Sequence, residues 1–283
     1  MDIVDAQVHL FMTMNDEVAV HAMDALGIQG AVIDEAWDFG EQGPHHSSMP
    51  AYELATGEWR PISPGGVRAA MHRPDRFSYL LRINPDDPGA AFVMAEAAAT
   101  PGCRAFRLDS RGEREDRAAE SGERMDFFRA AERLGVPVFV NSFGRAPVFE
   151  PYIRACPDLP VIFDHCGLSP KSSDFDALLS LAAYPNTHVK WCHAPIVFRA
   201  GRYPFPEVRP FLNRALEAYG RERIMWASDF TAVPLAARVL KGPQYSWAEA
   251  LFYMRDNPDL SESDLEWLLG RSVRTVLDWP TGA

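Results

Sequence analysis

The stretch Leu159–His165, LPVIFDH, decides the fold of this chain. A short run of branched and aromatic residues that ends abruptly in polar ones is typical of a strand buried on both faces of a parallel sheet. The same form recurs in GVPVFVN from Gly135, THVKWCH from Thr187 and RIMWASDF from Arg223. Each of these runs has, at its end or one residue before it, a residue that is capable of chemistry.

Helix-like segments separate the strands along the whole chain. Further strands are predicted at 2–9, 30–34, 77–83 and 103–108, and helices at 15–27, 89–100, 125–134, 208–220, 246–255 and 263–277. Asn15 and Gly27 have the residue types that begin and end a helix, and Ser263 and Glu266 have the spacing of a capping box. A charged loop is predicted between the fourth strand and the helix at 125–134.

Eight strands that alternate with helices predict an α/β fold, a single (β/α)8 TIM barrel over residues 1–283. Such barrels contain about 250 residues. A doubly wound open sheet is the rival fold, but no strand is followed by GxGxxG or GxxxxGK[ST].

The segment 35–66, between the second strand and the next helix, is predicted to be a long irregular loop. A loop of this length in a compact domain is usually functional or disordered. It is either a lid over the site or a contact with another subunit, and its candidate residues are Trp37, Phe39, His45, His46, Tyr52 and Trp59.

The composition is acidic, with 28 Lys and Arg against 39 Asp and Glu and a net charge of −11. This charge argues against nucleic acid and anionic membranes as partners. The sequence has no apolar run long enough for a membrane span, no basic leader, and four cysteines without a CxxC pair. We therefore expect a cytoplasmic protein with reduced cysteines.

Catalytic groups of a TIM barrel lie at the carboxyl ends of its strands. His9, His165 and Asp229 end three of the predicted strands. Each one alone could be structural, because Asp229 could cap a helix and His165 could belong to a turn. Their convergence on one rim favours a shared active site. The other polar or aromatic candidates near strand ends are Gln7, Arg82, Arg107, Asn141 and Trp191.

Six segments resemble motifs of the amidohydrolase superfamily, in its amidohydrolase-2 branch of lactonases and non-oxidative decarboxylases. VDAQVHLF is similar to the D-x-H-x-H opening, GCRAFRL to G-x-x-G-[IV]-R, and PVIFDHCGLSP to D-H-x-G. HVKWCHA, RIMWASDF and LLGRSVRTVLDW resemble the motifs of the last two strands and the terminal helix. The resemblance covers nearly the whole chain.

Two departures from the family pattern concern the metal. Gln7 stands where metal-dependent members have the first histidine, and Asn141 stands where decarboxylases have a metal-binding histidine. Neutral amides are poor ligands for a divalent transition metal. Some lactonases of the branch work without metal, so the resemblance implies a site without a tightly bound one. A zinc or manganese ion, if present, would be held by His9, His165 and Asp229.

The resemblance implies a hydrolase that opens a lactone or similar cyclic ester bearing a carboxylate. Asp229 is the candidate general base, with its pKa expected to be raised by partial desolvation. His165, His9 and the Gln7 amide would donate to the oxyanion. Arg107, with Arg82, would bind the substrate carboxylate. Asn141 and Trp191 would contact the substrate, although Trp191 could equally belong to the core.

Two other functions stay open. One is a metal-dependent non-oxidative decarboxylase (a lyase) of an aromatic or unsaturated acid, which suits the fold but not Gln7 and Asn141. The other is a barrel that binds a ligand without turnover, but such a protein has no need of both Asp229 and His165. A homo-oligomer is compatible with the resemblance.

Overall fold

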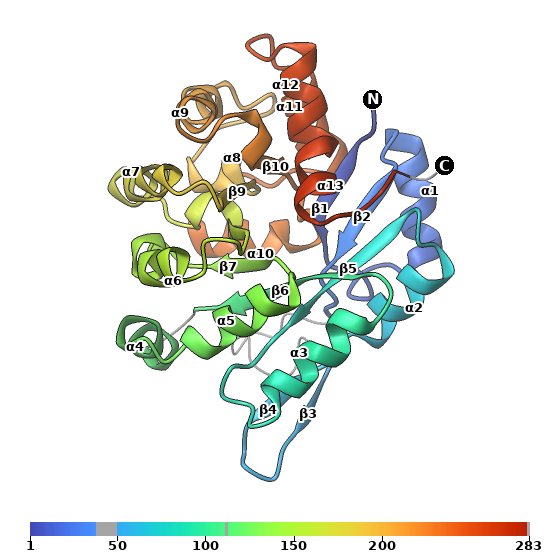
Figure 1. Cartoon of the computed structure of the whole chain (residues 1–283). Helices are drawn as coiled ribbons and strands as arrows, with labels where there is room; N and C mark the ends of the chain where they lie inside the picture. The colour runs from blue at the N-terminus through green and yellow to red at the C-terminus, as the bar shows by residue number, and fades with distance from the viewer. Residues whose placement is uncertain (38–49, 111–112, 282–283) are drawn as a thin grey trace.

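Eight parallel strands form one barrel with helices around it (Figure 1). The computed structural model describes residues 1–37, 50–110 and 113–281. The strand order in the sheet is β1-β2-β5-β6-β7-β8-β9-β10. These strands are β1 Val4–Val8, β2 Gly30–Ile33, β5 Phe77–Arg82, β6 Cys103–Asp109, β7 Val138–Asn141, β8 Val161–Phe163, β9 Thr187–Trp191 and β10 Ile224–Trp226. The predicted TIM barrel is confirmed, and the open sheet is excluded.

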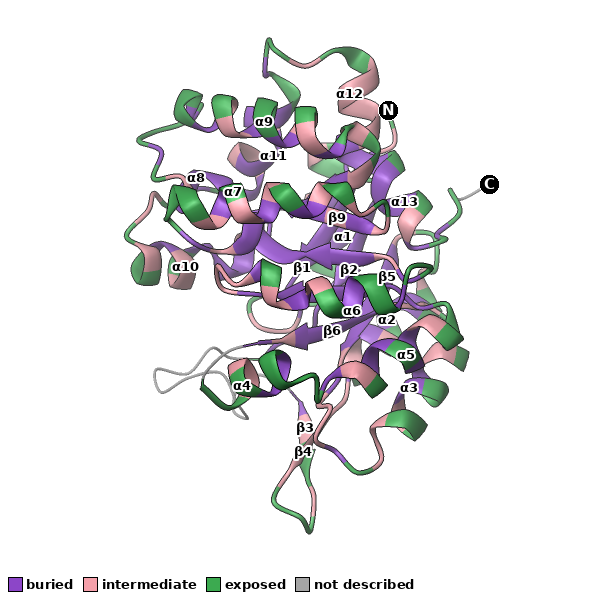
Figure 2. Cartoon of the chain, turned by 60° about the vertical axis from the view of Figure 1, so that its left-hand side comes forward, coloured by how far each residue is buried: buried purple, intermediate pink, exposed green. Residues whose placement is uncertain are grey.

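The helices lie outside the strands, with their exposed faces toward solvent (Figure 2). They are α1 Asp16–Leu26, α2 Pro64–His72, α3 Ala90–Ala99, α4 Glu113–Ser121, α5 Met125–Leu134, α6 Glu150–Ala155, α7 Ser172–Ser180, α8 Ala194–Val197, α9 Arg209–Tyr219, α10 Val233–Leu240, α11 Trp247–Arg255, α12 Glu262–Glu266 and α13 Ser272–Val276. Helix α1 begins and ends as predicted, because the Asn15 side chain accepts from the Val18 amide and Gly27 adopts a φ of 73°. No helix in the described ranges is both long and apolar enough to cross a membrane.

Three local predictions are wrong. Part of the predicted charged loop is helix α4, whose few apolar residues give no helical periodicity. Part of the predicted irregular segment is an antiparallel hairpin of β3 (Ala51–Glu53) and β4 (Trp59–Pro61), which projects from the barrel (Figure 1). The capping box near the carboxyl end is formed by Ser261 and Asp264, two residues earlier than the predicted Ser263 and Glu266.

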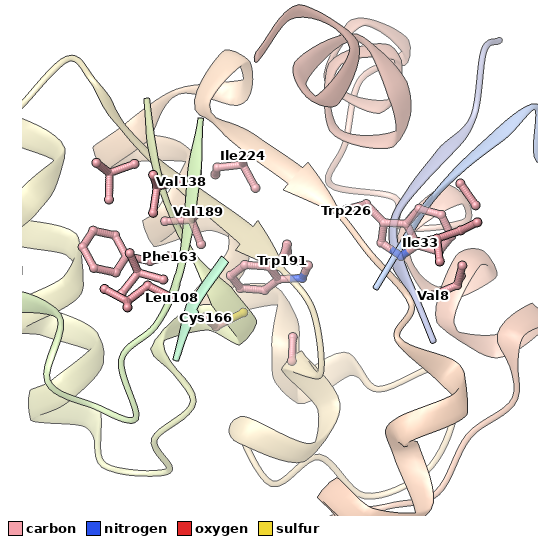
Figure 3. Packing of buried hydrophobic residues seen from close by; sticks show 14 of the residues in the cluster. Val8, Ile33, Leu108, Val138, Phe163, Cys166, Val189, Trp191, Ile224 and Trp226 are labelled. Atoms are coloured by element: carbon pink, nitrogen blue, oxygen red, sulfur yellow. The ribbon is translucent and has the colours of Figure 1, made fainter. Parts of the chain in front are cut away.

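Alternate residues of the strands pack into two separate apolar clusters. One cluster lies between the strands and the helices and includes Val138, Phe163, Val189 and Trp226 (Figure 3). The other cluster lies inside the barrel. It contains the strand residues that alternate with those of the first cluster, together with residues of the carboxyl-terminal segment. Its members include Val4, Val32, Leu80, Ala105, Phe139, Ile162, Met225, Val273 and Trp279. Strands buried on both faces explain why they are apolar almost throughout.

The first and last strands meet at the barrel seam through residues near the predicted site. The Asp229 amide donates to the Gln7 carbonyl oxygen (3.1 Å), and the Ser228 amide donates to Oδ1 of Asp5 (2.9 Å). The other carboxylate oxygen of Asp5 accepts from Trp247 at the start of α11 (2.7 Å). The seam therefore fixes the positions of β1 and the segment after β10 relative to one another.

A bulge in β1 lets Gln7 point into the barrel although Asp5, two residues earlier, faces the helix layer. Asp5 pairs with Ala31 and Val8 pairs with Ile33, so β1 contains one residue more than β2 between these pairs. Asp5 therefore faces the helix layer, whereas Gln7 reaches Lys190 on β9, a strand that does not neighbour β1. Bulges commonly re-aim side chains beside active sites.

Candidate active site

Three predicted or neighbouring site residues follow strands in a left-handed backbone conformation. His165 follows β8 with a φ of 53°, His193 follows β9 with a φ of 52°, and Asp229 follows β10 with a φ of 44°. This conformation is uncommon for residues other than glycine and is concentrated at functional sites. The three residues lie together at the carboxyl end of the barrel, where TIM barrels have their active sites.

Asp229 is the centre of the site. Its Oδ1 lies 3.1 Å from Nε2 of His9, and its Oδ2 lies 3.0 Å from Nε2 of His193. His165 is also near, with Nε2 at 4.0 Å from Oδ2. All four side chains are buried. The predicted convergence of His9, His165 and Asp229 is therefore present in the structure.

The pKa of Asp229 differs from the expectation. Burial alone would raise the pKa of this carboxyl, but the His9 and His193 imidazoles outweigh burial and hold the pKa well below its ordinary value. The expected rise was wrong because sequence does not reveal two imidazoles in direct contact with the carboxylate. Asp229 is thus ionised throughout the neutral range.

His193 and Tyr245 form a chain of hydrogen bonds to Asp229. The Tyr245 hydroxyl lies 3.0 Å from Nδ1 of His193. If Tyr245 donates to Nδ1, then Nε2 of His193 carries the proton and donates to Asp229, which satisfies all three groups. Tyr245 was not among the predicted residues. Tyr245 lies in the loop between α10 and α11, and no local sequence pattern points to it.

Gln7 and His9 contact one another inside the barrel. Nε2 of Gln7 lies 3.0 Å from Nε2 of His9, and Nδ1 of His9 lies 2.8 Å from the carbonyl oxygen of Asp34. The Oε1 atom of Gln7 accepts from the buried Lys190 ammonium, which also lies 2.5 Å from Oδ1 of Asp164. Lys190 was not predicted, although a lysine within the apolar run VKW was a visible signal.

The two candidate arginines are already paired with carboxylates. Arg107 contacts Asp34 and lies 2.8 Å from Oδ2 of Asp164, and only 2% of its side chain is exposed. Arg82 contacts Asp34 (2.5 Å) and Asp109, and 15% of its side chain is exposed. Arg82 and Arg107 also outweigh the effect of burial on Asp34 and hold its pKa well below the ordinary value. The positive charge expected for a substrate carboxylate is thus largely offset within the protein.

His165 is a neutral hydrogen-bond donor. Burial, followed by the nearby Lys190 and His193, lowers the pKa of His165 well below its ordinary value. Its Nε2 lies 3.2 Å from Nη2 of Arg107, which can only donate, so the proton of the neutral ring is on Nδ1. Within the described part of the chain, this buried Nδ1 has no hydrogen-bond partner.

The remaining candidates have different surroundings. Asn141 is buried, and its Oδ1 has no hydrogen-bond partner among the described residues. Trp191 is fully buried and lies in the hydrophobic cluster, with its ring 5.7 Å from that of Phe198 (Figure 3). These surroundings favour the core alternative for Trp191 and give no support for contact with a substrate.

The positions that the resemblance gives for a metal do not suit one. Gln7 could bind a cation only through Oε1, and this oxygen already accepts from the Lys190 ammonium. A divalent ion there would lie beside a buried positive charge with which it would be in strong repulsion. Asn141 offers a neutral amide oxygen, which is a weak ligand for zinc.

A second group of possible ligands shares His165 and Asp229 with the first and adds Cys192 and His193. Donor atoms of His165, Cys192, His193 and Asp229 all lie within 4.8 Å of one another, and the set has the chemistry of a zinc site. Burial raises the pKa of the Cys192 thiol well above its ordinary value, so the thiolate that zinc requires is disfavoured. Nε2 of His165 also lies against the Arg107 guanidinium.

The predicted lid is described only in part. Phe39, His45 and His46 lie outside the described residues. Trp37 is 53% exposed and donates to Glu35, and Tyr52 on β3 is 61% exposed. Neither a lid nor a subunit contact follows from these positions, so both stay predictions.

Comparison with known proteins gives one sequence relative and many similar folds. L-fucono-1,5-lactonase from Burkholderia ambifaria is 28% identical over 110 residues, which cover 36% of this chain and 37% of the relative. The match therefore spans little more than a third of that relative's length.

Two solved structures share the fold over almost the whole chain. An amidohydrolase from Burkholderia multivorans with bound HEPES has a TM-score of 0.74 at 17% identity, covering 99% of this chain and 100% of that one. Another crystal form of that protein contains zinc. A proposed 2-pyrone-4,6-dicarboxylic acid hydrolase from Pseudomonas putida has a TM-score of 0.65 at 17% identity, covering 98% of both chains.

At these identities the two structures show the fold alone. The sequence match to a family model is more informative, because the model described as amidohydrolase covers residues 67–277. This match includes β6, which contains Arg107, and β8 and β10, which His165 and Asp229 follow. The chain belongs to the amidohydrolase family.

Proposed function

We propose that this protein is a hydrolase that opens a lactone or a similar cyclic ester, with Asp229 in the general base and without a tightly bound metal. The observation that carries the proposal is the ionised carboxylate of Asp229, held between His9 and His193 beside the neutral donor His165. A base and a hydrogen-bond donor on one rim are the two groups that ester hydrolysis requires.

The reaction adds water across the ester bond. A water molecule next to Asp229 attacks the carbonyl carbon, and its proton passes to the pair formed by Asp229 and His9. Because a carboxylate with a low pKa is a weak base alone, the imidazole 3.1 Å away shares the proton. When the ring C–O bond breaks, the same proton goes to the leaving oxygen, which gives a hydroxy acid.

The negative charge that develops on the carbonyl oxygen needs a donor that is not already used. Nδ1 of His165 is buried, carries a proton and has no acceptor among the described residues. Such a pre-positioned donor stabilises an oxyanion without reorganisation. A lactone is an activated ester, so this donor and the base suffice without a metal as Lewis acid.

The comparisons favour a lactone as the substrate class. The sequence relative is named as a lactonase of a sugar acid, and a structural neighbour is named as a hydrolase of a pyrone dicarboxylate, which is also a cyclic ester. A carboxylate on the substrate remains part of the proposal. Arg82 is the better candidate to meet it, since Arg107 is almost fully buried between Asp34 and Asp164.

A panel of lactones tests the proposal. Sugar 1,4- and 1,5-lactones and pyrone carboxylates are incubated with the purified protein, and acid release is followed with a pH indicator. We expect hydrolysis above the spontaneous rate for at least one class, with the hydroxy acid confirmed by mass spectrometry. Release of carbon dioxide from an aromatic acid, with no lactone turned over, would replace the proposal with the decarboxylase alternative.

A further inference from the structure

The side-chain amide of Asn141 is buried, and its oxygen lacks a partner in the described part of the chain. Only 3% of Asn141 is exposed, and its Oδ1 atom accepts no hydrogen bond from any described residue. Its backbone carbonyl oxygen, in contrast, accepts from the Ser110 amide (3.1 Å). Burial of a polar atom without a partner costs free energy, so a ligand is a natural source of the missing hydrogen bond.

The strand pattern directs the Asn141 side chain into the barrel. On β7, Val138 and Val140 belong to the cluster between strands and helices, whereas Phe139 belongs to the cluster inside the barrel. Successive side chains of a strand point to opposite faces, so Asn141 lies on the same side as Phe139. Asn141 is also the last residue of β7, at the end of the barrel where TIM barrels have their active sites.

The neighbours of Asn141 are a solvent-exposed part of the rim and the segment that contains the proposed oxyanion donor. On one side Asn141 pairs with Asp109 of β6, whose side chain is 30% exposed and contacts Arg82. On the other side β7 contacts the turn Asp164–Gly167, which contains His165. Neighbouring strands lie about 4.8 Å apart, a distance that a six-membered ring with its substituents can bridge.

We propose that Asn141 is a specificity-determining residue, whose amide pairs with a hydroxyl group on the ring of the substrate. A hydroxyl group both donates and accepts, so it satisfies the amide whichever way the amide is turned. A carboxylate can only accept, so it cannot pair with Oδ1. The inference rests on the proposed function and deepens it, because it selects hydroxylated lactones over rings without hydroxyl groups.

Asn186 is a structural asparagine of the same chain and provides the comparison. Its side-chain nitrogen donates to three backbone carbonyl oxygens, at 3.2, 3.0 and 3.1 Å, which belong to Ile153, Cys156 and Leu159. These hydrogen bonds fix the loop before β8. The Oδ1 atom of Asn141 makes no comparable contact in the described ranges, so the fold gains no hydrogen bond from it.

The first test compares two lactones on the wild-type protein. The polyhydroxylated 1,5-lactone that reacts fastest in the panel and δ-valerolactone have the same ring size and differ in their hydroxyl groups. Each kcat/KM is divided by the rate of hydrolysis by hydroxide, which removes the difference in intrinsic reactivity. We expect a corrected preference of at least about 100-fold for the hydroxylated lactone, because a site that binds a hydroxyl group rejects an analogue without one. An equal or reversed preference overturns the inference.

Asn141→Leu removes the amide and keeps a side chain of similar size. We expect the preference for the hydroxylated lactone to fall at least about tenfold, because one hydrogen bond to the substrate is lost. Asn186→Leu is the matched control and should keep the wild-type preference. An equal loss of kcat/KM for both lactones in Asn141→Leu would mean that Asn141 has a structural role, which overturns the inference.

Thermal unfolding without ligand is a measurement independent of lactone chemistry. Asn141→Leu replaces an unpartnered buried amide by an apolar side chain, so its Tm should equal or exceed that of the wild-type protein. Asn186→Leu loses the hydrogen bonds to three carbonyl oxygens and should have a lower Tm. A clear fall in Tm for Asn141→Leu, or its failure to fold, would show that the fold itself uses the amide and overturns the inference.

A failure of the proposed function is recognised separately. If no lactone in the panel reacts, 1,5-anhydro sugar alcohols of several stereochemistries replace the lactones, since they keep the hydroxylated ring but have no carbonyl group. Titration calorimetry should then show binding to the wild-type protein and at least about tenfold weaker binding to Asn141→Leu. That result removes the proposed function and leaves the assignment of Asn141 intact. Absence of binding by all of these alcohols overturns the assignment as well.

Discussion

Nε2 of His193 lies 3.0 Å from Oδ2 of Asp229, and this contact orients the carboxylate at the centre of the site. The contact also fixes which ring nitrogen of His193 is protonated, because Nε2 must carry a proton in order to donate to Asp229. Nδ1 is then left to accept from Tyr245. The orientation of the Asp229 carboxylate thus depends on a hydroxyl group that contacts His193.

Tyr245→Phe tests that dependence. Loss of the hydroxyl removes the donor to Nδ1, so His193 can adopt the other tautomer and cease to donate to Asp229. A single hydrogen bond of this kind corresponds to about a tenfold loss in kcat, with KM almost unchanged. Tyr203→Phe, at a position 41% exposed, is the control. Equal kcat values for the two variants would show that Tyr245 plays no part in orienting the base.

Asp229→Asn removes the ionised carboxylate. Asparagine has nearly the same shape, can still accept from His193, and tolerates the left-handed backbone at this position (φ 44°) better than most residues. We therefore expect a folded protein whose hydrolytic kcat is at least about 100-fold lower. Circular dichroism and steady-state kinetics are the measurements.

The control for this variant is Asp176→Asn, which removes a surface carboxylate paired with Arg214 and 56% exposed. Its activity should equal that of the wild-type protein. If both variants retained full hydrolytic activity, Asp229 would not be part of the general base.

Removal of metal should leave the activity unchanged. The Oε1 atom of Gln7 already accepts a hydrogen bond from Lys190. Burial raises the pKa of the Cys192 thiol well above its ordinary value, so both possible groups of ligands are poorly suited to zinc. The protein is dialysed against a chelator, its metal content is measured by elemental mass spectrometry, and lactone hydrolysis is assayed with and without added zinc. Near-stoichiometric zinc together with loss of activity on chelation would contradict this prediction.

Asp5 should make the stability of the barrel depend on pH. Burial is the largest effect on this carboxyl and raises its pKa to about 6, against the hydrogen bonds from Ser228, Gln7 and Trp247. Because the folded pKa lies above the unfolded value, the folded protein binds more protons between about pH 4 and 6. The contribution of Asp5 to stability is therefore greatest at low pH and is lost as the pH rises through 6.

Asp5→Asn does not titrate and isolates this effect. The free energy of unfolding of the wild-type protein minus that of Asp5→Asn should fall by about 2 kcal/mol between pH 4 and pH 7. Urea denaturation at several pH values gives the difference. Asp256→Asn, at a surface position 53% exposed, is expected to show no such trend. A difference that rises with pH would mean that the hydrogen bonds outweigh burial.

The barrel could be predicted because its strands and helices have strong local patterns. Buried strands such as Val161–Phe163 are apolar throughout, and α1 has both a capping asparagine and a terminal glycine. Helix α4 could not be found in this way, because only Ala118 and Ala119 are buried and the other residues are polar or charged. Such a helix has no apolar stripe to indicate its period.

The site could be predicted as a set of strand ends but not as a network. His9, His165 and Asp229 could be placed together from their positions at the ends of predicted strands, because the strands of a parallel barrel end at one rim. Their protonation depends on contacts between distant segments. Lys190 and Gln7 are 183 positions apart, and Tyr245 is 52 positions from His193. No local pattern encodes these pairs, so the low pKa of Asp229 and the pairing of Arg107 could not be predicted.

The seam between β1 and the segment after β10 has a consequence for the order in which the candidate site is assembled. His9 is synthesised well before Thr231, whose hydroxyl accepts from the His9 amide and which follows 222 positions later. The carbonyl oxygen of Gln7 likewise gains its hydrogen-bond donor, the Asp229 amide, only after β10 has been synthesised. A growing chain therefore contains His9 early, and acquires Asp229 only after β10 has been added. Closure of the barrel and the meeting of His9 with Asp229 therefore depend on the same late segment of the chain.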